Sequence, residues 1–366
     1  MRVHVVDPPA YTPPYDHALC SSLVVAGADV TLVTTGFPHG ATARDGGYAV
    51  DEAFYRWRPA GRLRRPSRLA QHVPDMLAYR RRARAADVVH FQWLSVQQLD
   101  ARLLPSGVPL VLTAHDVLPR EPRPGQRKAQ LRLYERVDAV VVHTEHGRER
   151  LTGELGIDPA KVHVIAHGAF THLADAPGPG PLPAELAAVD KPVVLLFGLM
   201  RPYKGIDVAV EAWRGIEDAE LWVVGMPLMD TASLRAAAPR GVRFVERFID
   251  DRELPAFFRR ADLVLLPYRE IDQSGVLFTA LAFGRPLLLS DVGGFPEIAA
   301  QGAAALVTAG DAAALRAELR RLLSDPAARA TLADRAGAIA RERYGWDAIA
   351  SAHLELYERL AAAGRR

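Results

Sequence analysis

Short apolar runs that alternate with helical stretches constrain this chain more than any other feature. Six runs rich in β-branched residues lie before residue 170, and six more follow residue 190. Such runs, bounded by helical segments, are typical of strands buried on both faces of a parallel sheet. The Pro- and Gly-rich stretch ADAPGPGPLPAEL separates the two sets. We therefore predict an α/β protein with two similar units. The runs are VHVVD, DVTLVTT, DVVHFQW, PLVLTAHD, AVVVHT, VHVIAHG, PVVLLFG, ELWVVG, VRFVERF, LVLLPY, PLLLSDV and AALVTA.

The chain length supports this division, because 366 residues exceed what one hydrophobic core usually serves. We place an N-terminal domain at residues 1–170, a linker at 171–188 and a C-terminal domain at 189–343. The Ala-, Leu- and Arg-rich tail predicts two closing helices, and we expect the last part, 344–366, to pack back on the N-terminal domain. Parallel sheets bind ligands at the carboxyl ends of their strands, so we expect a site in a cleft between the two domains.

The composition and the first residues favour a cytoplasmic protein. The net charge of +2 gives no reason to expect a nucleic-acid partner. MRVHVVDPP runs straight into a strand, without the apolar region and cleavage site of a secretion signal. No apolar run approaches the ~20 residues of a membrane span, and the single Cys20 cannot form an internal disulfide.

One basic segment, residues 56–84, could hold an anionic membrane surface. Asp75 is its only acidic residue. In a chain that uses arginine throughout, we favour a solvated face and expect no membrane contact. Trp57 and Leu69 do not form a clear insertion face in the sequence.

Two loops in the second half of the chain predict a site for a diphosphate. The stretch SGVLFTALAF is a helix that stops at Gly284, with Ser274 as its N-cap, so the amides of Gly275 and Val276 can receive a phosphate. In FGLMRPYKGID, Arg201 and Lys204 lie just before another helix. Two cations at a helix start oppose the helix dipole unless an anion lies between them. We expect both to be solvent-exposed loop cations that stabilise a leaving diphosphate.

These two motifs, some 70 residues apart, resemble the C-terminal half of the retaining glycosyltransferases of the GT-B fold, in family four. HVVD, VVHFQW, TAHD, VHVIAHG and the closing YGW helix stand in the order expected for that family. The resemblance implies two Rossmann-like domains facing across a cleft. It also implies transfer of a hexosyl unit from a nucleotide-diphosphate sugar, such as a UDP-sugar, to an acceptor, with retained configuration and without a catalytic metal or other cofactor.

The resemblance assigns roles to several residues. Arg201 and Lys204 bind the diphosphate, the loop before Gly275 binds the hexose, and His115 of TAHD faces the donor sugar from the other domain. The leaving phosphate itself takes the proton of the acceptor hydroxyl. The acceptor is not identified, because the loops that shape its site vary freely over a fixed scaffold.

The chain departs from the family pattern at three places. Ile271 and Thr279 stand where the family usually has two glutamates. Either Glu270 or Asp272 could turn to the sugar hydroxyls instead, and Thr279 could give the ribose one weaker hydrogen bond. YTPPYDHAL replaces the customary Gly-Gly of the first loop, so we expect Tyr15, Asp16 and His17 to line a different acceptor entrance.

Two other functions stay open at this point. A non-hydrolysing sugar-nucleotide epimerase shares the architecture but needs carboxylates and histidines around the donor C2, and RPYKGID fits a transferase better. A non-catalytic partner subunit would explain the missing second glutamate, but not the retained Arg201 and Lys204.

We interpret the remaining strand histidines as structural, because no two have metal-ligand spacing. They are His4, His90, His143, His163 and His167.

Overall fold

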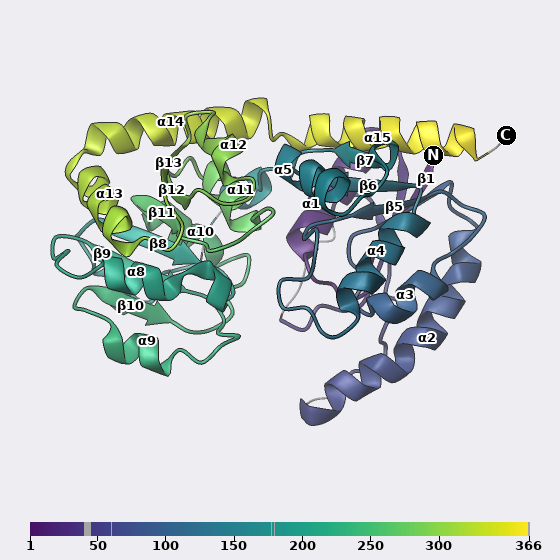
Figure 1. Ribbon diagram of the computed structural model, residues 1–366, viewed down its shortest axis with the longest axis horizontal. Coiled ribbons are helices and arrows are strands. Elements are labelled where there is room, and N and C mark those ends of the chain that lie inside the picture. Colours follow the sequence, from purple (N-terminus) through teal and green to yellow (C-terminus); the bar gives the residue numbers. More distant parts are fainter. Residues whose placement is uncertain (40–44, 60, 177, 179, 365–366) are drawn as a thin grey trace. The chain divides into compact units, whose positions relative to one another are not determined.

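The computed structural model describes residues 1–39, 45–59, 61–176, 178 and 180–364. The chain divides into two compact units (Figure 1). Unit 1 comprises Met1–Gly168 and Trp346–Arg366, and unit 2 comprises Ala169–Gly345. The stretch that the sequence predicts as a linker, 171–188, holds two short helices of unit 2, and its positions 177 and 179 lie outside the described residues.

Unit 1 is built on a parallel sheet of seven strands in the order β3-β2-β1-β4-β5-β6-β7. Six of them coincide with the predicted apolar runs, and β3 is an additional short strand paired with β2. The central strands β4, β5 and β6 are buried at every position, as expected for a sheet covered on both faces. The strands are β1 (Arg2–Asp7), β2 (Asp29–Thr34), β3 (Ala49–Asp51), β4 (Val88–Phe91), β5 (Leu110–Thr113), β6 (Ala139–Val142) and β7 (Val162–Val164).

The last helix of the chain, α15 (Trp346–Ala363), packs against α1 (Pro13–Val25) in unit 1. Its His353 and Tyr357 are fully buried, and the Tyr357 hydroxyl lies 2.6 Å from Nδ1 of His90 in β4. The other helices of unit 1 are α2 (Arg64–Ala83), α3 (Gln97–Leu103), α4 (Gln126–Arg136) and α5 (Glu145–Glu149), with a π-turn at Arg150–Glu154 and 3-10 turns at Gly61–Leu63 and Pro159–Lys161.

Unit 2 has a parallel sheet of six strands in the order β10-β9-β8-β11-β12-β13. The strands are β8 (Val193–Phe197), β9 (Glu220–Val224), β10 (Val242–Val245), β11 (Leu263–Leu266), β12 (Leu287–Ser290) and β13 (Ala304–Val307). The helices are α6 (Thr171–Ala174), α7 (Ala184–Ala187), α8 (Ile206–Ala212), α9 (Ala232–Ala237), α10 (Leu254–Arg260), α11 (Gly275–Ala282), α12 (Phe295–Ala299), α13 (Ala312–Ser324) and α14 (Pro326–Glu342), with a 3-10 turn at Pro202–Lys204.

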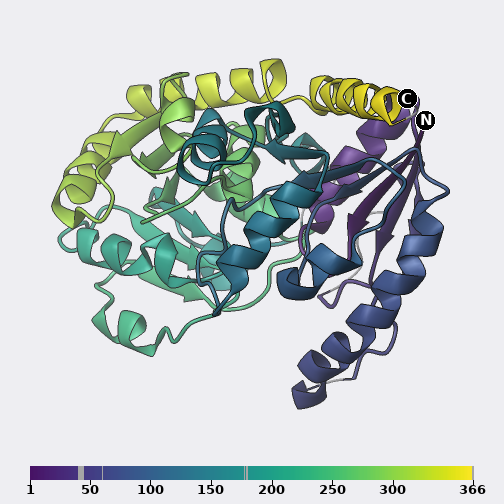
Figure 2. The ribbon, with the colours of Figure 1, turned by 45° about the vertical axis from the view of Figure 1, so that its right-hand side comes forward.

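In both views the first turns of α2 extend beyond the rest of unit 1 (Figures 1 and 2). Among the described residues, no helix is both long and apolar enough to cross a bilayer.

Candidate functional site

The two motif-bearing loops of unit 2 meet where β8 and β11 end. The backbone N–H of Arg269 donates to the carbonyl of Tyr203 at 2.7 Å, and the Arg269 side chain pairs with Asp207. Gly205 has a φ of +65°, and a Cβ there would lie only 2.0 Å from the carbonyl oxygen of Pro267. The strands β8 and β11 are neighbours in the sheet, so the loops that follow them close on each other.

Lys204 is held inside this junction. Its side chain crosses back to β8, where Nζ donates to the carbonyl of Phe197 at 3.2 Å and to the hydroxyl of Tyr268 at 2.9 Å. The residue is 4% exposed, and Arg201 is half-buried. The expectation of an exposed loop cation is therefore wrong for Lys204, because the aromatic ring of Tyr268 and the β8 carbonyl enclose its ammonium group.

The ammonium group of Lys204 lies beside the start of α11, because both adjoin Gly198. Gly198 has a φ of +108°, and a Cβ at this position would lie 2.7 Å from Nζ of Lys204 and 3.2 Å from Cγ2 of Val276. A side chain at residue 198 would push both neighbours away. The fold thus brings the ammonium group of Lys204 and the side chain of Val276, in the first turn of α11, together around Gly198.

The start of α11 offers backbone donors. Ser274 occupies the N-cap position, as predicted, but its side chain does not cap the helix, and its own N–H donates to Oε1 of Gln273 at 2.8 Å. Gly275 and Val276 are half-buried, and the first amides of a helix have no intrahelical acceptor. The positive end of the helix dipole, the first N–H groups of α11 and a buried lysine together have the character needed to hold a phosphate, which stays a prediction.

The two residues that could replace the missing hexose glutamate differ in exposure. Glu270 is exposed, whereas Asp272 is 5% exposed. The backbone of Asp272 is fixed against the turn that follows β12, because the Gly294 N–H donates to the carbonyl of Asp272 at 3.2 Å. Which of the two faces a hexose stays a prediction.

Thr279 is buried in α11, and its hydroxyl donates to the carbonyl of Gly275 at 2.9 Å. This bond back to the preceding turn uses the only hydrogen of the hydroxyl group. A ribose contact could therefore use only the oxygen of Thr279 as an acceptor, and this contact also stays a prediction.

In unit 1, polar side chains gather at the carboxyl edge of the sheet. Each lies at or just beyond the end of a different strand, and neighbouring strands bring them together. His115 stacks on Trp93 with ring centroids 4.9 Å apart, and its Nδ1 lies 3.2 Å from Nε2 of His143. Sequence reasoning missed His143 and His167 as neighbours of His115. Their common place just beyond a strand is the signal that could have found them. The residues are Asp7 (β1), Gln92 (β4), His115 (β5), His143 (β6) and His167 (β7).

The hydrogen bonds of this cluster fix the tautomer of His115. Nδ1 of His143 lies 2.9 Å from the carbonyl of Ile165, which can only accept, so Nδ1 carries the hydrogen. Nε2 of His143 must then accept from Nδ1–H of His115, which leaves Nε2 of His115 as an acceptor. The Gln92 amide lies 3.1 Å from this atom, and its NH₂ group has no other partner among the described residues, so it donates here once the amide is turned.

Both imidazoles are neutral near pH 7. Burial, and then the nearby imidazoles of His143 and His167, hold the pKa of His115 well below its usual range. Burial lowers the pKa of His143 to about 4, against a smaller opposite effect of the Ile165 carbonyl. Both ring nitrogens of the neutral His115 thus have partners within unit 1, and a ligand hydroxyl could bind Nε2 only in place of the Gln92 amide.

Two of the three residues expected at the acceptor entrance, Tyr15 and Asp16, are each 1% exposed. Tyr15 packs its ring against His115 and Trp346, and its hydroxyl is buried with no hydrogen-bond partner among the described residues. Asp16 is hydrogen-bonded to Asp7. Neither offers open surface in this structure, so their contact with an acceptor stays a prediction. His17 is half-buried, and its Nδ1 lies 2.9 Å from the Tyr48 hydroxyl.

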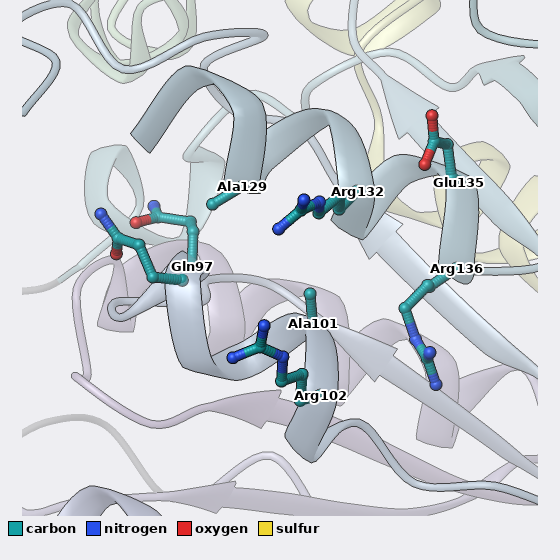
Figure 3. A pocket seen from close by; sticks show the side chains of 8 residues that line it. Gln97, Ala101, Arg102, Ala129, Arg132, Glu135 and Arg136 are labelled. Carbon is teal, nitrogen blue, oxygen red and sulfur yellow. The ribbon is translucent and has the colours of Figure 1, made fainter. Parts of the chain in front are cut away.

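A pocket of about 310 Å³ lies elsewhere in unit 1, between α3 and α4 (Figure 3). Arg102 and Arg132 extend from the two helices toward the space between them. The pocket contains none of the predicted site residues. Its lining is Gln97, Gln98, Ala101, Arg102, Ala129, Arg132, Glu135 and Arg136. Within the described parts of the chain, no group of three or more His, Cys, Asp or Glu residues is placed to hold a metal ion.

Comparisons with known proteins identify the family of this chain. The family model of Glycosyltransferase Family 4 matches residues 15–173, and that of Glycosyl transferases group 1 matches residues 191–325. The D-inositol 3-phosphate glycosyltransferase of Xylanimonas cellulosilytica is 31% identical over 303 residues, which cover 74% of this chain and 71% of that protein. The alpha-maltose-1-phosphate synthase of Mycolicibacterium smegmatis is 27% identical over 314 residues, 76% of this chain and 81% of that protein.

Solved structures share the fold over nearly the whole chain. A sucrose-phosphate synthase from Thermosynechococcus elongatus superposes with a TM-score of 0.77 at 21% identity, covering 99% of this chain and 100% of that one. Anabaena HepE in complex with UDP and glucose gives a TM-score of 0.77 at 19% identity, covering 98% and 100%. Two Rossmann-like units with these relatives define a glycosyltransferase of the GT-B fold. The chain belongs to the group 1 glycosyltransferases of family four.

Proposed function

We propose that this glycosyltransferase moves a hexosyl unit from a nucleotide-diphosphate sugar to an acceptor hydroxyl and retains the anomeric configuration. One observation carries the donor assignment: Lys204 and the start of α11 flank Gly198, where any side chain would intrude. A buried ammonium group beside free helix amides suits a diphosphate, which carries two to three negative charges at neutral pH. The HepE structure named above contains UDP and glucose, which supports the same class of donor.

In the proposed reaction the acceptor oxygen forms a bond to C1 of the sugar while the bond between C1 and the diphosphate oxygen breaks. The acceptor proton passes to the leaving phosphate, so the products are the glycosylated acceptor and a nucleoside diphosphate. Lys204, Arg201 and the amides of Gly275 and Val276 stabilise the charge that develops on the leaving group. Because these groups supply positive charge, we propose that no divalent metal is needed. His115 orients the donor sugar through a hydroxyl.

The transfer is tested by incubating the full chain with nucleotide sugars and a mixture of candidate acceptors, with and without EDTA. Proton NMR of the glycosylated product gives its anomeric configuration. We expect the configuration of the donor and an unchanged rate in EDTA. An inverted product would contradict retention, and a rate that only Mg²⁺ or Mn²⁺ restores would contradict the metal-independent mechanism.

A further inference from the structure

Tyr268, in the loop that leads from β11 to α11, is completely buried. A buried tyrosine usually finds a partner for its hydroxyl group. Two neighbouring rings fix the position of this side chain. The ring of Tyr203, in the turn after β8, packs edge-on at a centroid distance of 5.7 Å, and that of Phe295, in α12, lies at 5.5 Å. The Tyr268 hydroxyl therefore has a defined place where the two loops meet.

The partner of this hydroxyl is the ammonium group of Lys204, whose Nζ lies 2.9 Å away. An ammonium group can only donate, so the hydroxyl oxygen accepts. The carbonyl of Phe197 accepts a second N–H of the same group at 3.2 Å. Phe197 ends β8 and Tyr268 follows β11, and these strands are neighbours in the sheet. The ammonium group is thus held from two strand ends at once.

These two bonds determine where the third N–H of Lys204 can point. A lysine side chain is flexible and loses rotamer freedom when its end is held. Here bonds within unit 2 already hold it, next to the side chain of Val276 in the first turn of α11. A group that is held in place before its ligand binds does not have to be ordered during binding, and this raises the affinity.

We propose that Tyr268 is a positioning residue, whose hydroxyl holds the ammonium group of Lys204 toward the start of α11. This inference rests on the proposed function, in which Lys204 binds the diphosphate of the donor. Tyr268 acts through Lys204 and supplies no charge of its own. A purely structural tyrosine would use Lys204 only as a partner for its own hydroxyl. Loss of that hydroxyl would then lower the stability of the fold without changing the affinity for a diphosphate.

The variant Tyr268→Phe separates these two roles, because it keeps the buried ring and removes only the acceptor for Lys204. The probe is inorganic pyrophosphate, which presents a diphosphate without a nucleoside. Calorimetric titration of the full chain measures its affinity. We expect Tyr268→Phe to weaken pyrophosphate binding about tenfold, since a hydrogen bond to a charged group is lost. An unchanged affinity would overturn the proposal.

The matched control is Tyr344→Phe, which makes the same chemical change elsewhere in unit 2. Tyr344 is also buried, and its hydroxyl accepts a hydrogen bond from Nε2 of Gln301 at 2.8 Å. This variant should bind pyrophosphate as tightly as the unmodified chain does. An equal loss of affinity in the two variants would assign the effect to a general loosening of unit 2 and would also overturn the proposal.

A second measurement reports on Lys204 without any ligand. Proton–nitrogen NMR detects a lysine ammonium group only when its hydrogens exchange slowly with water, and the variant Lys204→Gln identifies the signal of Lys204 by its absence. We expect this signal in the unmodified chain and in Tyr344→Phe, and its loss in Tyr268→Phe. A signal that is missing from the unmodified chain, or that persists in Tyr268→Phe, would overturn the positioning role. An unmodified chain that shows the signal but does not bind pyrophosphate would contradict the proposed function and, with it, this role.

Discussion

At the scale of the residue, Gly198 occupies a position that a side chain cannot share with Lys204. We predict that Gly198→Ala lowers the free energy of unfolding by ~2–4 kcal/mol, because it combines an unfavourable φ with a contact of 2.7 Å to Nζ. Donor binding should be lost as well. Chemical denaturation and nucleotide binding measure the two effects.

Gly156→Ala is the control for this substitution, because Gly156 has a φ of +68° and a Cβ there would have nothing within 4 Å. This variant should lower the free energy of unfolding by ~1 kcal/mol, through backbone strain alone, and leave donor binding intact. Equal costs for both variants together with normal donor binding by Gly198→Ala would refute the role given to Gly198.

His143 is a positioning residue for His115, if the proposed function holds. We predict that His143→Phe lowers turnover about fivefold with little change in KM, because it removes the acceptor for Nδ1–H of His115, a bond worth ~1 kcal/mol. Nitrogen NMR of the free protein should show the Nδ1–H tautomer of His115 in the unmodified chain and a mixture of tautomers in the variant. His143→Gln, which keeps an acceptor, should recover part of the rate. An unchanged tautomer in His143→Phe would contradict the hydrogen-bond chain.

Some properties of single residues could be predicted from the sequence, and others could not. Local spacing predicted the N-cap position of Ser274, which the structure confirms, and a phosphate-binding role for Lys204, which stays a prediction. It could not show that Lys204 is buried, since Tyr268 reaches it only after the loops that follow β8 and β11 close on each other. The neighbourhood of His115 likewise depends on the pairing of β5, β6 and β7 and not on local sequence.

At the scale of the element, the end of β1 and the start of α1 are joined by two buried carboxyl groups. Burial raises the pKa of Asp7 to about 6, and burial together with the charge of Asp7 raises the pKa of Asp16 well above its usual range. The N–H groups of Tyr11 and Thr12 favour the ionised form of Asp7, so Asp16 carries the shared proton. Between pH 4 and about 6 the folded protein therefore binds more protons than the unfolded chain.

The free energy of unfolding contributed by Asp7 falls as the pH rises through that range, by about 3 kcal/mol. We predict that Asp7→Asn removes this slope, so that the variant gains stability relative to the unmodified chain as the pH rises from 4 to 7. Urea denaturation of both proteins at several pH values gives the difference between their free energies of unfolding. The buried histidines contribute equally to both proteins, so their contribution cancels in this difference. A difference that is independent of pH would contradict the raised pKa of Asp7.

Elements were well predicted where the sequence pattern is strong. All the apolar runs form strands, because short apolar runs between helical segments are typical of the strands of a parallel sheet. Strand β3 was missed, since its three residues AVD carry almost no pattern. Helix α2 was not predicted either, because Pro74 within it removes a helical hydrogen bond and normally argues against a helix.

At the scale of the whole molecule, the repeated pattern of strands and helices predicted two α/β units, and the motifs in the second half predicted the family. The acceptor could not be predicted. Tyr15 and Asp16, which the sequence suggested as acceptor-binding residues, are both buried. The residue types in the loops at the carboxyl edge of unit 1 do not identify a particular ligand.

The central claim is that Lys204 and the first N–H groups of α11 bind the diphosphate of a donor. Thermal unfolding of the full chain with a panel of UDP-, GDP-, ADP- and TDP-sugars tests it most directly, using Lys204→Gln and the control Lys191→Gln, whose exposed side chain also bonds a backbone carbonyl of unit 2. A donor at 100 times its dissociation constant should stabilise the unmodified chain and Lys191→Gln by about 2.7 kcal/mol. Lys204→Gln should fold but show little of this stabilisation. Equal stabilisation of Lys204→Gln, or none of the unmodified chain by any donor in the panel, would contradict the account.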